Sequence, residues 1–168
     1  MINKRFLFTW LLLVCILLTL NSCGFRLRGS AGVIVPLPAT YVAGEGASAV
    51  LLADLRRGMR DAGVVLVGAR EDSRAVLAVT GEEKDRRVLS VGSTGAAQEY
   101  ELRYAVTFTV IDHEGKEILP GQTIERVRAV SHTPAQVIAK ESEDELLYRE
   151  LRREVVQGMV RRLGAIGK

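Results

Sequence analysis

Residues 99–112 read EYELRYAVTFTVID, and this stretch decides the fold. Its apolar side chains recur at every second position and share one face of an extended strand: Tyr100, Leu102, Tyr104, Val106, Phe108 and Val110. Thr107 and Thr109 fall on the opposite face. The alternation predicts a strand with one buried face, which is typical of an antiparallel sheet that is covered on one side.

The residues that follow this strand predict a hairpin. The segment His113-Glu114-Gly115-Lys116 has the polar, glycine-containing composition of a tight turn. Residues 118–131 then alternate again, and we expect them to return antiparallel to residues 99–112. The chain therefore places two long neighbouring strands at the centre of the predicted sheet.

The residues that precede this strand predict a further turn and shorter strands. The segment Gly92-Ser93-Thr94-Gly95 lies between two apolar stretches and predicts a turn. A loosely alternating stretch edged by Pro36 and Pro38 predicts the first strand. The strands expected before the turn are residues 33–38, 64–67, 75–80 and 86–91.

Two segments have the periodicity of amphipathic helices. Residues 47–62 carry apolar side chains at three- and four-residue steps, and Gly63 stands where a glycine cap ends a helix. A second helix is predicted to begin near Thr133-Pro134 and to end at Gly164. Their apolar stripes are Leu51, Leu55, Met59 and Ala62, then Leu147, Leu151, Val155, Met159 and Leu163.

These elements predict an α+β fold. We expect a two-layer sandwich in which two helices pack on one face of a mostly antiparallel, mixed sheet of four to five strands. Residues 23–168 are expected to form this single domain, because removing residues 1–22 leaves 146 of the 168 residues, about the size of one domain.

Residues 1–22 predict a cleaved signal peptide. After a positively charged start, residues 6–20 form an apolar run of about 15 residues, which is short for a membrane-spanning helix of about 20. The run closes as Leu20-Asn21-Ser22-Cys23, which resembles the bacterial lipobox. We expect cleavage before Cys23 and lipidation of that cysteine. The alternative is a plain secretory signal or an N-terminal membrane anchor in which the cysteine is incidental.

A lipidated Cys23 would tether the domain to a membrane. Two or more acyl chains anchor a protein stably, at about 0.8 kcal/mol for each buried methylene, where one chain is marginal. The next residue is Gly24, whereas an aspartate there resembles an inner-membrane retention signal. The sequence therefore predicts an anchor in the outer membrane.

Charge and composition exclude several classes of function. Lys4 and Arg5 leave with the signal, so the mature chain has 21 basic and 20 acidic residues. With 5% aromatic residues as well, it lacks the basic groove and stacking aromatics of single-strand nucleic-acid binders, and we expect no nucleic-acid partner. Cys23 is the only cysteine of the mature chain, which excludes an internal disulfide and a cysteine metal site.

Catalytic signatures are absent from the sequence. It contains no Gly-x-Ser-x-Gly, no His-Glu-x-x-His and no Walker loop. His113 and His132 are its only histidines and predict ordinary surface positions. The acidic residues at 141–145 suit the first turn of a helix, where they complement the helix dipole. We expect no catalytic residues, no metal and no cofactor.

Three blocks of sequence resemble the LPS-assembly lipoprotein family LptE. The first is Cys23-Gly-Phe-Arg-Leu-Arg-Gly29, which resembles the start of the mature family chain. The second is Gly95-Ala-Ala-Gln-Glu-Tyr-Glu-Leu102, and the third is Pro134-Ala-Gln-Val-Ile-Ala-Lys-Glu141 followed by Glu145 and a long helix. The blocks keep the family's order and spacing, and with the helices they cover nearly the whole mature chain.

The resemblance implies a non-enzymatic role in the outer membrane. Members of the family plug the LptD β-barrel, assist its assembly, and bind lipopolysaccharide as the pair inserts it into the outer leaflet. We therefore expect an LptD-like β-barrel and lipopolysaccharide as partners. The domain is expected to face the periplasm and the barrel lumen, while the lipid on Cys23 anchors the protein in the outer membrane.

The resemblance also implies candidate lipopolysaccharide-binding residues. A lysine in the Ala-Lys run is linked to this binding in the family, and Lys140 matches it. The alternative is a solvated lysine that pairs with Glu143 or Asp144 on the next turn.

A second candidate group precedes the Gly-x-x-x-Glu-Tyr segment. The family has a basic residue there, whereas this chain has Ser93. Arg86 and Arg87, on the preceding strand, could supply the positive charge instead, because guanidinium groups bind phosphate well.

Two other functions stay open from the sequence alone. An outer-membrane lipoprotein that binds peptidoglycan or a phospholipid would keep the lipobox but not the ordered second and third blocks. An anchored periplasmic hydrolase would need a nucleophile and base, and two scattered histidines give that reading little support.

Overall fold

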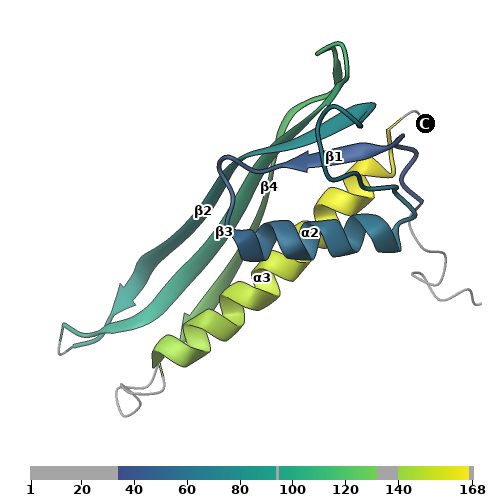
Figure 1. The fold of residues 1–168 in the computed structure, drawn as a ribbon. Helices are drawn as coiled ribbons and strands as arrows, with labels where there is room; N and C mark the ends of the chain where they lie inside the picture. Colours follow the sequence, from purple (N-terminus) through teal and green to yellow (C-terminus); the bar gives the residue numbers. More distant parts are fainter. Residues whose placement is uncertain (1–33, 94, 132–139, 167–168) are drawn as a thin grey trace, which may run out of the picture. The chain divides into compact units, whose positions relative to one another are not determined.

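The computed structural model describes residues 34–93, 95–131 and 140–166, and six elements follow one another along them (Figure 1). In chain order they are β1 (Thr40–Ala43), α2 (Ala49–Asp61), β2 (Ala75–Val91), β3 (Ala97–Asp112), β4 (Glu117–Ser131) and α3 (Lys140–Leu163). The predicted start of the last helix at Thr133-Pro134 lies outside the described residues, as does Cys23.

The described strands form one open sheet in the order β1-β2-β3-β4. β1 runs parallel to β2, whereas β2 pairs antiparallel with β3, and β3 with β4. Both helices cover the same face of the sheet, and α3 runs along it and crosses α2 (Figure 1). The predicted α+β sandwich with a mixed, mostly antiparallel sheet is confirmed.

The core lies between the helices and β3. The predicted alternation is confirmed, because the alternate apolar side chains of β3 from Leu102 to Val110 are fully buried. Burying one such side chain stabilises the fold by about 1.5–3 kcal/mol. The helices contribute the stripes that their periodicity predicts: Leu51, Leu55 and Met59 of α2, and Leu151, Val155, Met159 and Leu163 of α3.

The first strand is not where the sequence predicts it. Residues 34–38 form no strand, and β1 lies further on at Thr40–Ala43. Pro36 and Pro38 have no N–H to donate to a ladder, whereas the backbone N–H of Thr40 donates to the Val65 carbonyl. Residues 64–67 are also not a strand, since only Leu66 forms an isolated bridge to Thr40.

The two strands predicted at 75–80 and 86–91 are one. β2 runs through 17 residues, because β3 supplies a partner for the charged residues between them. A register shift between Val79 and Gly81 marks a bulge in the first half of the strand. A glycine followed by four charged residues is typical of a loop, so the local sequence hides this continuity.

The long strands extend beyond the core. At about 3.3 Å per residue, the 17 residues of β2 span roughly 55 Å. Side chains near the start of β2 are buried, whereas those of residues 83–89 are exposed. α3 follows the sheet toward this second half (Figure 1). Among the described helices none is both long and apolar enough to cross a membrane.

Candidate functional site

The candidate binding residues gather at the end of the sheet that lies outside the core. Arg86 and Arg87 lie near the end of β2, Ser93 lies in the turn to β3, and Lys140 is the first residue of α3. We call this region the distal end: residues 83–91 of β2, the β2–β3 turn, residues 97–101 of β3 and the first two turns of α3.

Arg86 connects β2 to the start of α3. Its guanidinium lies 3.0 Å from the carboxylate of Asp144, and its Cζ lies 3.9 Å from the centre of the Tyr100 ring. The Arg86 side chain stays 35% exposed, so water still reaches it. An arginine held between a carboxylate and an aromatic face loses less freedom when it binds a further anion.

Tyr148 holds the same helix end against β2. Its hydroxyl donates a hydrogen bond of 2.8 Å to the backbone carbonyl of Asp85, and Lys84 Nζ lies 5.5 Å from its ring centre. Burial raises the pKa of Tyr148, and the charges of Asp144 and Asp85 raise it further. The phenol therefore stays protonated at neutral pH and remains a donor.

Arg87 does not join Arg86. Neighbouring residues of a strand point to opposite faces, and Arg87 lies across from Glu101 on the face that the helices leave open. Its guanidinium lies 3.0 Å from the Glu101 carboxylate, with 67% of the arginine side chain exposed. Arg86 and Arg87, which were expected to supply positive charge together, thus lie on opposite faces of the sheet.

The turn at Gly92–Gly95 is confirmed as a hairpin connection. Gly92 donates its N–H to the Ala96 carbonyl at 2.8 Å, and Gly95 has a positive φ of 80°, which favours glycine. Ser93 is exposed in this turn, whereas Thr94 lies outside the described residues. The turn therefore presents Ser93 to solvent at the tip of the β2–β3 hairpin.

The backbone of Lys140 lies one helical turn before Asp144, the partner of Arg86. The Lys140 side chain is outside the described part of the structure. The structure thus brings the Arg86 strand and the Lys140 helix end together, although they are far apart in the sequence.

A hydrogen-bond network around the Glu82 carboxylate is not predicted from the sequence. Tyr104 donates a hydrogen bond of 2.6 Å to Glu82, which also accepts one of 2.6 Å from the N–H of Ser48 and a longer one from its hydroxyl. Ser48 caps α2, so Glu82 ties the start of that helix to the sheet. Nothing in the local sequence around Glu82 indicates this contact.

The network shifts the pKa of both partners. Burial alone would raise the pKa of Glu82, but the hydrogen bonds from Tyr104 and Ser48 and the charge of Lys84 lower it below its ordinary value. Burial and the Glu82 carboxylate raise the pKa of Tyr104. Among the described residues, no group of three or more histidine, cysteine, aspartate or glutamate side chains could hold a metal ion.

Comparison with known proteins places this arrangement in a family. A family model described as "LptE: Lipopolysaccharide-assembly" matches residues 32–163. The LPS-assembly lipoprotein LptE of Yersinia enterocolitica is 28% identical over 160 residues, which cover 91% of this chain and 73% of the relative. The Yersinia pestis protein of the same name is 29% identical over 154 residues.

Solved structures agree with these relatives. The solution NMR structure of an uncharacterized lipoprotein B from Nitrosomonas europaea is 29% identical with a TM-score of 0.70, covering 84% of this chain and 91% of that one. The crystal structure of the rare lipoprotein B from Shewanella oneidensis is 31% identical with a TM-score of 0.61, covering 72% and 92%. The chain therefore belongs to the LptE lipopolysaccharide-assembly family.

Proposed function

We propose that this chain is the lipoprotein subunit of a lipopolysaccharide translocon. In this proposal a lipid on Cys23 anchors it in the outer membrane, and the domain faces the periplasm and fills the lumen of an LptD-like β-barrel. There it helps the barrel assemble and binds lipopolysaccharide as the lipid is inserted into the outer leaflet. The chain catalyses no reaction.

The observation that carries the proposal is the junction of β2 with the start of α3. Arg86 is held at this junction by Asp144 and stays partly exposed. The backbone of Lys140 lies one helical turn before Asp144. Lipopolysaccharide presents phosphates and acidic sugars, which arginine and lysine side chains bind through charge-assisted hydrogen bonds. The distal end therefore has the chemistry that the ligand requires.

The open face of the sheet supports the barrel contact. Arg103 lies 2.7 Å from Glu125 of β4 and 3.0 Å from Glu83 of β2, and Thr107 and Thr123 share a hydrogen bond of 2.8 Å. A protein surface that meets the polar lumen of a barrel needs such polar and charged groups rather than an apolar patch. We assign this face to the barrel wall.

Depletion and affinity capture together test the proposal. A tagged form of the full-length protein, captured in mild detergent, is expected to retain a large β-barrel partner. Depletion of the protein is expected to lower the amount of lipopolysaccharide at the cell surface. Absence of a barrel partner together with unchanged surface lipopolysaccharide would contradict the proposal.

A further inference from the structure

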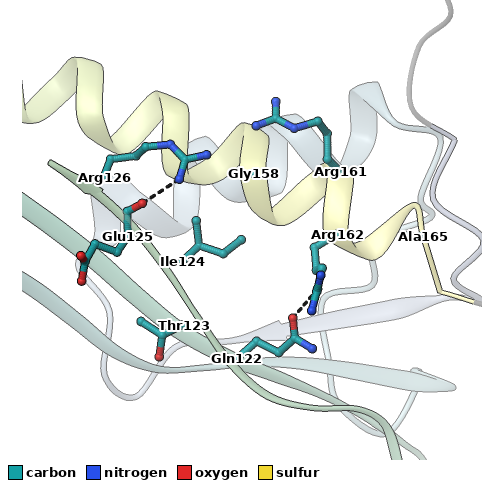
Figure 2. Close-up of a pocket in the computed structure, with 9 residues that line it drawn as sticks. All are labelled: Gln122, Thr123, Ile124, Glu125, Arg126, Gly158, Arg161, Arg162 and Ala165. Atoms are coloured by element: carbon teal, nitrogen blue, oxygen red, sulfur yellow. Dashed lines mark hydrogen bonds between the residues drawn. The ribbon is translucent and has the colours of Figure 1, made fainter.

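A groove lies between β4 and the last turns of α3, at the other end of that helix from Lys140 (Figure 2). Its volume is about 540 Å³ and it is open to solvent. Since α3 begins at Lys140 and rises about 1.5 Å per residue, the groove lies roughly 30 Å along the helix from Lys140. Its lining residues are Gln122, Thr123, Ile124, Glu125, Arg126, Gly158, Arg161, Arg162 and Ala165.

Gly158 lets the helix approach the sheet at the floor of the groove. A Cβ at this position would lie 3.2 Å from Cγ2 of Ile124 and 3.6 Å from a terminal nitrogen of Arg126. Gly158, Ile124 and Ala165 leave a floor of small or apolar groups, and the arginines surround it (Figure 2). The groove thus joins an apolar base to a cationic rim.

Three guanidinium groups from two elements give the groove its charge. Arg126 comes from β4, and Arg161 and Arg162 come from α3. The carboxylate of Glu125 does not neutralise them, because it lies 2.7 Å from Arg103 on the open face of the sheet. The rim therefore has more positive than negative charge.

The remaining partners of these arginines compensate Arg126 in part, and they leave Arg161 and Arg162 without a carboxylate partner among the described residues. Glu154 lies 3.8 Å from Arg126 and 2.9 Å from Arg128, and Arg128 also has the carboxylate of Glu150 at 2.6 Å, so Glu154 compensates the charge of Arg126 in part. Arg162 donates to the neutral side-chain carbonyl of Gln122 (Figure 2). Within the described residues, no carboxylate lies in ion-pair distance of Arg161, which is exposed.

The helix dipole explains only part of this arrangement. Basic residues in a last turn complement the carbonyl end of a helix, which accounts for Arg161 and Arg162 as residue types. It does not account for Arg126, which comes from a strand, or for Gln122, which orients Arg162. Two elements supply a cationic rim around one floor, which is the arrangement of an anion site.

We propose that this groove binds a phosphate group that is carried by a larger molecule. Guanidinium forks match phosphate oxygens, and three of them suit a dianion better than a single carboxylate. A groove of about 540 Å³ has room for more than the phosphate, and the apolar floor would contact the molecule that carries it. The inference is independent of the lipopolysaccharide contact proposed for the distal end.

Phosphorus NMR of the ligand tests the site on the full-length protein in detergent. Inorganic phosphate and dihexanoyl phosphatidic acid are titrated separately, so that free phosphate and a lipid headgroup are distinguished. We expect phosphatidic acid to bind to the wild-type protein, and binding of inorganic phosphate alone would contradict a larger ligand. We expect Arg161→Glu combined with Arg162→Glu to weaken the binding of phosphatidic acid about tenfold or more, which is what loss of charge-assisted hydrogen bonds implies.

Arg57→Glu combined with Arg60→Glu is the matched control. These arginines are exposed on α2 and the double substitution changes the net charge by the same amount. We expect the control to bind within about twofold of wild type, since Arg57 and Arg60 do not line the groove. Binding by neither ligand, equal binding by the groove variant and wild type, or an equal loss in the control would overturn the proposal. Equally tight binding of tetraglutamate would overturn the choice of phosphate over carboxylate.

Discussion

The guanidinium of Arg86 in β2 and the carboxylate of Asp144 in α3 lie 3.0 Å apart. The contact joins β2 to the start of α3 at the distal end. The side chain of Asp144 is only 13% exposed. Part of the positive charge of Arg86 is therefore compensated by Asp144 in a contact that stabilises the fold. The same contact fixes where the remaining donors of the guanidinium point.

Arg86→Gln and Asp144→Asn are expected to show coupled effects on stability. The pair is partly exposed, so its coupling is expected to be about 0.5–1 kcal/mol. Urea unfolding of both single variants and the double variant measures this free energy. Strict additivity of the two single changes would show that the contact contributes nothing.

Lys140→Asp is expected to weaken lipopolysaccharide binding several-fold, because it replaces a cation that can donate hydrogen bonds to phosphate by a repelling charge. The fold and the barrel association should persist. The measurement is lipopolysaccharide capture by the detergent-solubilised protein. Lys116→Asp, in the exposed turn between β3 and β4, makes the same charge change and should bind as wild type. Equal binding by wild type and Lys140→Asp would remove Lys140 from the site.

Tyr104→Phe is expected to destabilise the domain by about 1–3 kcal/mol, because it removes a donor from the partly buried Glu82 carboxylate. Loss of the Tyr104 hydrogen bond should also raise the pKa of Glu82. Thermal or urea unfolding checks the first effect. An unchanged midpoint would contradict the role of this hydrogen bond in holding the start of α2.

The lowered pKa of Glu82 predicts a dependence of stability on pH. A carboxyl whose folded pKa lies below its unfolded value of about 4.3 contributes its full stability above that value. The contribution is lost as the pH falls through the folded pKa. Glu82→Gln should therefore be less stable than wild type at neutral pH, and the gap should narrow in acid. A gap that stays constant down to about pH 3 would contradict this account.

Arg152→Met is expected to cost about 2 kcal/mol, because Arg152 is 9% exposed and its Nε lies 2.8 Å from the carboxylate of Asp54 on α2. The substitution leaves that carboxylate partly buried without its donor. Adding Asp54→Leu should recover most of the loss, since an apolar pair often replaces a buried ion pair without cost. Failure of the second change to recover stability would show that Arg152 acts through its own packing.

The sequence predicts the parts of the fold that depend on periodicity. The alternation in residues 99–112 and the helical stripe from Leu147 to Leu163 describe the core, because burial selects apolar side chains at regular steps. The continuity of β2 is not predicted, since residues 81–85 are polar and become strand only through pairing with β3. β1 is misplaced because its pairing with β2 overrides the apolar pattern that contains Pro36 and Pro38.

The candidate site, like the fold, could be predicted from the sequence only in part. The residue types at Arg86 and Lys140 are visible in the sequence, but the contact between β2 and the start of α3, made by Arg86 and Asp144, depends on how α3 packs along the sheet. The separation of Arg87 from Arg86, in contrast, needs no tertiary contact to explain it. Neighbouring residues of a strand point to opposite faces of the sheet. The groove at Gly158 was not predicted, since Arg126 and Arg161 come from different elements and only the packing brings them together.

Photo-crosslinking in cells tests the lipopolysaccharide contact of the distal end most directly. A photoreactive phenylalanine analogue is placed at Ser93, in the exposed β2–β3 turn, and separately at Glu71, exposed in the loop before the opposite end of β2. A light-dependent lipopolysaccharide adduct is expected at position 93 and none at position 71. No adduct at position 93, or equal adducts at both positions, would contradict a lipopolysaccharide contact at the distal end.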